Sequence, residues 1–74
     1  MTIQLTGRIG TVISDYDDYW QAYRGYYDVT IWYQGTRYST RVEFDNIEYE
    51  DDLPCQGDGV AIKFDTETKT IEIL

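Results

Sequence analysis

The chain has no histidine and a single cysteine, Cys55, among its 74 residues. Without histidine there is no Ser-His or Cys-His nucleophile pair, and the usual ligands of a zinc site are missing. One cysteine cannot form an internal disulfide, and Cys55 has only acidic residues near it in sequence, whereas a reactive thiol needs cationic neighbours. There is also no glycine pattern for a cofactor. We therefore expect neither an enzyme nor a bound cofactor.

Long apolar runs are also absent. No stretch approaches the roughly 20 apolar residues that a membrane span requires. The N-terminus has no basic segment followed by an apolar run, so no signal peptide is indicated. We expect a cytoplasmic, soluble protein, folded as one domain over residues 1–74 with a single layer of core.

Basic residues are scarce: six stand against fourteen acids, for a formal charge of -8 and a pI near 4.1. Nucleic-acid binding draws its affinity from Lys and Arg that displace counterions, so direct binding of DNA or RNA is not expected. The same charge attracts basic protein surfaces, and it also serves solubility alone.

Alternating hydrophobic residues predict a strand over residues 2–13. Ile3, Leu5, Ile9 and Ile13 fall on one face of this strand, and glycines within it indicate a bulge or a sharp bend. A strand of this kind is typical of a small β-barrel.

The clearest hairpin follows, with strands from residue 26 and up to residue 44 around a tight turn at Gln34-Gly35. An acidic connection over residues 45–59 has room for one helical turn before Pro54. Two more strands, from Val60 to Phe64 and from Thr70 to Leu74, flank a turn at residues 65–68. These elements predict a mainly β fold of five antiparallel strands.

Five short strands with a kinked first strand fit a closed or nearly closed barrel. The stretches GTVI, YDVTIWYQGTRYSTRV and LPCQGDGVAIKFDTETKTIEI together resemble small barrel domains of the OB and SH3-like kinds, in which a Gly-Asp turn leads into the penultimate strand. The resemblance covers nearly the whole chain and concerns the fold, which many functions share. Residues 14–25 depart from it as an insertion between the first two strands.

This insertion has the boundaries of a short helix. Ser14 is a good N-cap, acids follow it, Arg24 would lie in the last turn and Gly25 would end the helix. Four aromatic residues recur at three- and four-residue spacing and would share one helix face: Tyr16, Tyr19, Trp20 and Tyr23. The alternative is an ordered but irregular loop.

Aromatic residues are the most unusual feature, because eight tyrosines, two tryptophans and two phenylalanines exceed what one small core can bury. Tyr and Trp supply contact area at interfaces while tolerating water. Either the 14–25 segment covers one mouth of the barrel, or its aromatics face a partner. In the second case the candidate partner-binding residues are Asp15, Tyr16, Asp17, Asp18, Tyr19, Trp20, Tyr23, Glu48, Tyr49, Glu50, Asp51 and Asp52.

The acids and the arginines also have simpler explanations. The run from Asp15 to Asp18 lacks the glycine and the distal glutamate of a calcium loop, so no metal is expected there. The acids at residues 48–52 fit a solvated face. Arg37 and Arg41 fall on one face of a strand, where we expect surface ion pairs with Glu43 or with aspartates across the sheet.

The leading functional hypothesis is a non-catalytic protein-binding module that docks on a basic surface. In size, acidity and tyrosine content the chain resembles phage-encoded inhibitors of host defence, such as anti-CRISPR and anti-restriction proteins. That resemblance implies inhibition by charge mimicry of DNA, in the cytoplasm of the host.

Two alternatives remain open. A barrel could present Trp20 and Trp32 to single-stranded nucleic acid or to a saccharide. A structural protein could instead assemble with itself, for example as a homodimer, by pairing edge strands around Tyr38 and Ile71.

Overall fold

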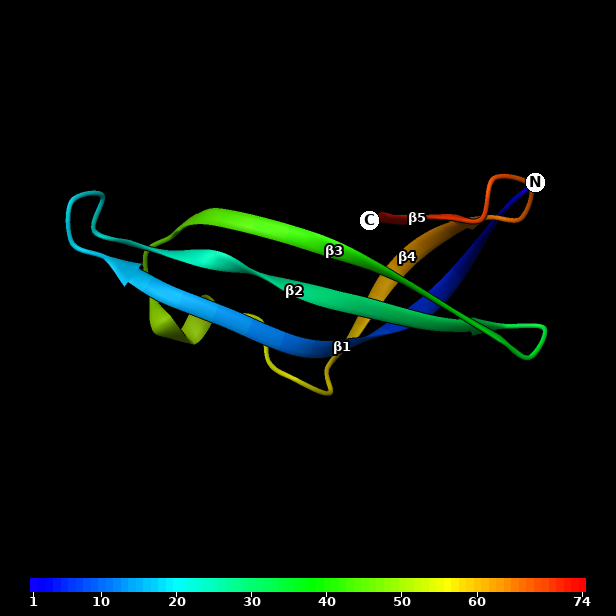
Figure 1. Ribbon diagram of the computed structural model, residues 1–74, viewed down its shortest axis with the longest axis horizontal. Helices are drawn as coiled ribbons and strands as arrows, with labels where there is room; N and C mark the ends of the chain where they lie inside the picture. The colour runs from blue at the N-terminus through cyan, green and yellow to red at the C-terminus, as the bar shows by residue number, and fades with distance from the viewer.

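The structure is a computed structural model that describes residues 1–74. It is mainly β, with five antiparallel strands in a single sheet that curls into a nearly closed barrel (Figure 1). The strands lie in the order β3-β2-β1-β4-β5, so β3 and β5 form the two edges. The elements are β1 (Thr2–Asp17), β2 (Ala22–Tyr33), β3 (Thr36–Ile47), η1 (Glu50–Asp52), β4 (Gly59–Asp65) and β5 (Thr70–Ile73). The predicted fold class is confirmed.

Neither the expected helix over residues 14–25 nor the alternative, an irregular loop of that length, forms. β1 continues to Asp17 and β2 begins at Ala22, so the segment is the end of a long hairpin, and its only loop is the turn between these two residues. Ser14 pairs with Gly25, and Asp15 pairs with Arg24, as ordinary residues of an antiparallel ladder. The helical turn expected before Pro54 is confirmed as η1.

The core lies on the inner face of the curled sheet and is built from Val29, Ile31, Ile62 and Phe64. Full burial of an aliphatic or aromatic side chain contributes roughly 1.5–3 kcal/mol. The Phe64 ring lies 5.1 Å from that of Tyr33 and 4.9 Å from that of Tyr38. Since Tyr38 is on the edge strand β3 and Phe64 on β4, which lies next to the other edge, this contact brings together strands that are not hydrogen-bonded neighbours.

The bulge expected in the first strand is confirmed between Ile9 and Val12. Ile9 pairs with Val29 whereas Val12 pairs with Tyr27, so β1 has one extra residue at this point. An extra residue moves every later side chain to the opposite face. The prediction that Ile13 shares one face of the strand with Ile3, Leu5 and Ile9 is therefore wrong, and Ile13 is 44% exposed.

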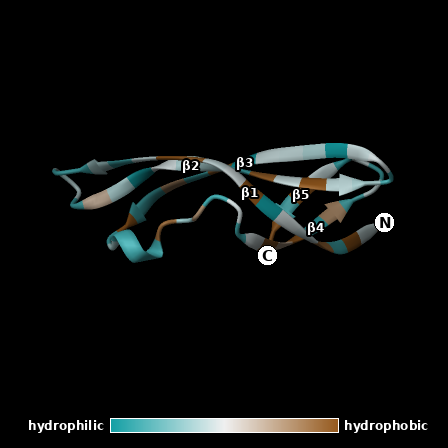
Figure 2. Ribbon diagram, turned by 90° about the horizontal axis from the view of Figure 1, so that it is seen from below, coloured by the Kyte–Doolittle hydropathy of each residue, from teal (hydrophilic) through white to brown (hydrophobic).

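Beyond the bulge, three strands extend past the barrel as an arm. β4 pairs with β1 only as far as Arg8. The remainder of β1, the first half of β2 and the second half of β3 continue as a three-stranded ribbon, which we call the arm (residues 10–28 and 41–47; Figure 1). The molecule is consequently elongated, at 43 × 20 × 14 Å. Figure 2 shows that η1, which follows the arm, is strongly hydrophilic.

Glycine is required at position 25, where the backbones of the paired strands β1 and β2 come very close together in the arm. A Cβ atom at this position would collide with the backbone carbonyl of Ile13, and also with the Cα atom of Ser14. Backbone cannot yield as a flexible side chain can, so only glycine allows this close approach.

Replacing Gly25 with alanine should lower the free energy of unfolding by at least about 2 kcal/mol, because the two backbones must separate. The matched control is Gly10→Ala, whose Cβ would meet only the Asp28 carbonyl oxygen at 3.8 Å. We expect that control to change stability by less than about 1 kcal/mol. Urea unfolding followed by tryptophan fluorescence measures both, and equal losses would contradict the close approach at Gly25.

Candidate partner-binding surface

Asp17 holds the tip of the arm. Its carboxylate accepts hydrogen bonds from the backbone N–H groups of Tyr19 at 2.9 Å and Trp20 at 3.2 Å. It also accepts one from the Arg24 side chain at 3.3 Å. The hydrogen bond from the Trp20 N–H has the largest effect on the pKa of Asp17 and lowers it, whereas desolvation, the next largest effect, raises it. The Arg24 side chain and the Tyr19 N–H lower it further, so that the pKa lies below its ordinary value. The Asp17 carboxylate thus makes its hydrogen bonds within the chain, to the backbone of the turn and to Arg24.

The same turn occurs once more in the chain, between β4 and β5. Asp65 accepts hydrogen bonds from the N–H groups of Glu67 and Thr68, as Asp17 does from the residues two and three positions on. Gln21 and Lys69, each four residues after its aspartate, both have a positive φ, of 52° and 60°. An aspartate that accepts from N–H groups two and three residues on is a standard device of turns. The shared pattern, an aspartate followed four residues later by a residue with a positive φ, could have indicated a hairpin turn at residues 17–22.

The aromatics of the arm tip face solvent and do not cover the barrel. Tyr19 is 83% exposed and Trp20 66% exposed, and their rings meet edge to face at 5.0 Å. Tyr16 and Tyr23 are cross-strand partners whose rings also meet edge to face, at 5.1 Å. None of these residues belongs to the core or packs against it. The segment therefore does not cover a mouth of the barrel.

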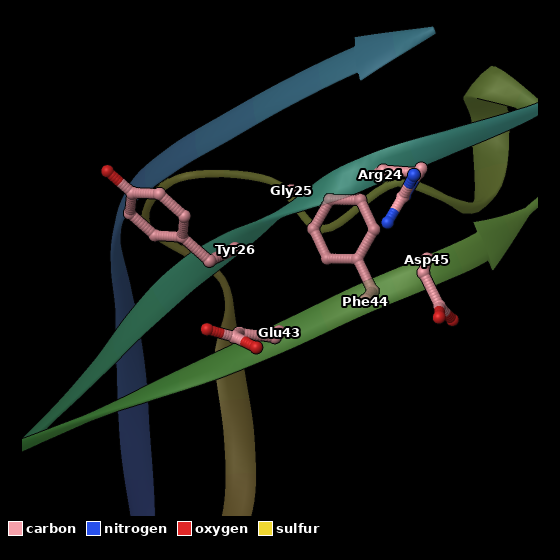
Figure 3. A pocket seen from close by; sticks show the side chains of 6 residues that line it. All are labelled: Arg24, Gly25, Tyr26, Glu43, Phe44 and Asp45. Carbon is pink, nitrogen blue, oxygen red and sulfur yellow. The ribbon is translucent and has the colours of Figure 1, made fainter. Parts of the chain in front are cut away.

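Three adjoining hollows on the arm all include Arg24, and we refer to them together as the arm groove. Their volumes are about 340, 380 and 510 Å³. Figure 3 shows the first of them, in which the Phe44 ring lies over Gly25, its cross-strand partner. Tyr26 and Glu43 lie to one side of the ring, and Arg24 and Asp45 to the other.

Acids and aromatics dominate the lining of the arm groove. One guanidinium, that of Arg24, stands among six carboxylates: Asp15, Asp17, Asp18, Glu43, Asp45 and Glu48. Of these six, only Asp17 forms an ion pair within the chain. The aromatic lining residues are Tyr16, Trp20, Tyr26 and Phe44. The groove therefore offers negative charge that the chain itself does not neutralise.

The structure brings together only part of the predicted set. Asp15, Tyr16, Asp17, Asp18 and Trp20 from the hairpin line the arm groove together with Glu48, which follows β3. Tyr19 and Tyr23 flank the groove without lining it. The other predicted residues, Tyr49, Glu50, Asp51 and Asp52, are exposed on and beside η1 and line none of the three hollows.

Several lining residues were not predicted, because the hairpin was expected to start at Tyr26 and to end at Phe44. Arg24 was assigned to the end of a helix, and Asp45 to a loop. In the structure Tyr26 pairs with Glu43, and Gly25 with Phe44. Extending the period-two alternation of these strands outward would have placed all of them on one ribbon.

Comparison of the chain with protein-family models, with curated proteins and with solved structures gives no match. The structure has no helix that is long and apolar enough to cross a membrane. It has no group of three or more Cys, Asp or Glu side chains arranged to hold a metal ion. The groups with which the arm groove can contact a ligand are its carboxylates, its aromatic rings and the Arg24 guanidinium.

The lowered pKa of Asp17 makes the arm tip sensitive to acid. A carboxylate whose pKa is lower in the folded state stabilises the fold above its unfolded value, near pH 4, and this stabilisation is lost as the pH falls through the folded value. The pKa of Asp65 is lowered in the same way, chiefly by the Glu67 N–H. We therefore expect the Tm to fall as the pH is lowered below about 4.

Asp17→Asn should show a smaller fall in Tm over this acid range than the unaltered chain, since its side chain no longer titrates. Asp18→Asn is the matched control, because the Asp18 side chain makes no hydrogen bond or ion pair. Thermal unfolding at a series of pH values gives the comparison. An Asp17→Asn curve that falls as steeply as the unaltered curve would contradict the assigned role.

Proposed function

We propose that the chain is a non-catalytic protein-binding module, and that its arm groove docks on a basic surface of another protein. The observation that supports this most is the set of five carboxylates in the groove without an ion pair, beside exposed aromatic rings. Lys and Arg side chains of a partner would pair with these carboxylates, and such charge-assisted hydrogen bonds are stronger than neutral ones.

The aromatic rings supply the apolar part of this contact. Tyr19 and Trp20 project at the tip of the arm, where they can pack against a partner or lie under its cationic side chains. Tyr and Trp are enriched among the residues that dominate binding energy, because they bury large areas at low entropic cost. Charge would steer the encounter, and the aromatics would hold the complex.

A partner of this kind is often a nucleic-acid-binding protein. Carboxylates held along a ribbon would stand where phosphates normally lie, so the bound chain would exclude the natural ligand. This is the mode of action that the resemblance in character to phage-encoded anti-defence inhibitors implies, and the site of action would be the host cytoplasm. We include inhibition by charge mimicry in the proposal on these grounds.

The test is affinity capture of partners at low and high salt, followed by binding measurements with a captured partner. A contact that depends on charge should weaken as salt shortens the Debye length from about 10 Å at 0.1 M to about 3 Å at 1 M. Asp15→Asn/Asp18→Asn should weaken binding about ten-fold, equivalent to about 1.4 kcal/mol.

The matched control, Glu67→Gln/Glu72→Gln, removes the same charge from the β4–β5 hairpin, away from the arm. It should leave the affinity within about two-fold of the unaltered chain, because neither residue lies in the arm groove and the ion pair that it removes, between Glu67 and the amino group of Met1, lies outside the arm as well. A partner that binds equally at both salt concentrations, or that both double variants weaken equally, would contradict the proposal.

A further inference from the structure

A second hollow lies on the outer face of the barrel, apart from the arm groove. It has a volume of about 630 Å³, within the range of roughly 300–1,000 Å³ that is usual for small-molecule sites. Its polar and aromatic lining comes from Thr6, Arg8, Thr30, Trp32 and Gln56. No carboxylate lines it, although the chain has fourteen acids.

The register of the sheet places two arginines on either side of Trp32. Arg37 on β3 is the direct cross-strand partner of Trp32 on β2. Arg8 on β1 is the cross-strand partner of Thr30, which is two residues from Trp32 and so shares its face. Side chains in such positions lie within about 4.5–8 Å of one another. Arg8 lines the hollow, whereas Arg37 does not and is placed beside the indole by the strand register. A ligand that covers the indole lies between the two.

These two arginines are the ones that the chain leaves unpaired. Arg24 pairs with Asp17, and Arg41 pairs with Asp28 at 3.8 Å while its guanidinium lies 4.1 Å from the centre of the Tyr26 ring. The ion pair expected for Arg41 is thus confirmed, whereas Arg37 forms none. In a chain with a charge of -8, the two arginines without an ion pair thus both stand beside Trp32 in the sheet register.

The Trp32 ring is itself free to stack. It is 67% exposed, and no other aromatic ring packs against it. Every nucleobase has a face that can stack on an exposed aromatic side chain. Arginine recognises phosphate with two parallel hydrogen bonds. The hydroxyls of Thr6 and Thr30 and the Gln56 amide can hydrogen-bond a ring edge or a sugar.

We propose that this hollow binds a small anion with a planar ring, of the nucleoside monophosphate class. The base stacks on Trp32, and the phosphate pairs with Arg8 or Arg37 according to the direction in which the nucleotide lies. The site takes one nucleotide rather than a strand, because a longer polyanion would extend toward the acids of the arm and gain little counterion release from two arginines.

Fluorescence isolates this site, because Trp20 and Trp32 are the only tryptophans. Trp20→Phe leaves Trp32 as the single reporter. Titration with adenosine 5′-monophosphate should quench its emission to saturation, with a Kd on the order of 0.1–1 mM. Of Arg8→Gln and Arg37→Gln in this background, the one that replaces the arginine paired with the phosphate should weaken binding about five- to ten-fold, because it removes the phosphate contact.

Three controls locate the ligand. Arg24→Gln alters a guanidinium of the arm and should leave the Kd unchanged. Trp32→Phe leaves Trp20 as the reporter at the arm tip, and its emission should not respond to the nucleotide. Inorganic phosphate should compete weakly, and a six-nucleotide single strand should bind no more tightly than the monophosphate.

The proposal is overturned if Trp32 shows no saturable quenching up to about 10 mM nucleotide. It is equally overturned if neither Arg8→Gln nor Arg37→Gln weakens binding more than Arg24→Gln does. Tighter binding of the six-nucleotide strand would overturn the restriction to one nucleotide. The quenching of Trp32 and the comparison of the arginine variants do not depend on the acids of the arm groove, so failure of either leaves the proposed protein-binding function standing.

Discussion

The contact of Phe64 with Tyr33 and Tyr38 is the interaction on which the rest of the structure depends. A flat five-stranded sheet of this size would expose one apolar face, and only four side chains form the fully buried cluster. Phe64 on β4 meets rings from the β2–β3 hairpin, so the sheet curls over its own inner face. The curl of the sheet determines both the barrel and the arm. The barrel buries the inner side chains, and the parts of β1, β2 and β3 that extend beyond the barrel form the arm.

The chain separates its charges along this elongated shape. Unpaired carboxylates collect around Arg24 on the arm, whereas the unpaired arginines flank Trp32 on the outer face of the barrel. A net charge of -8 alone would suggest one uniform field. The two exposed tryptophans lie in opposite electrostatic surroundings, which is why we assign them different ligands, a basic protein surface and a small anion.

Much of the fold follows from the sequence, because period-two alternation is a local signal of strands. The segment around Tyr16 and Tyr23 was wrongly predicted to be a helix, because residues seven positions apart can share a face in two structures. They lie two turns apart on one side of a helix, and they can also face each other across a hairpin with a four-residue loop. Two features favour the hairpin. The Asp17 carboxylate accepts hydrogen bonds from the Tyr19 and Trp20 N–H groups, and the backbones of β1 and β2 approach each other closely at Gly25. The exposure of Ile13 could not be predicted either, because it depends on the exact position of the bulge in β1, which is determined by the pairing of β1 with β2.

The central claim is that the acid-rich, aromatic segment forms an exposed hairpin rather than a helix packed on the barrel. Nuclear Overhauser contacts among residues 14–25 test it most directly. We expect cross-strand contacts between Asp15 and Arg24 and between Tyr16 and Tyr23, which pair in the ladder. Strong contacts between successive amide protons, with contacts from each residue to the third one along, would show a helix and contradict the account.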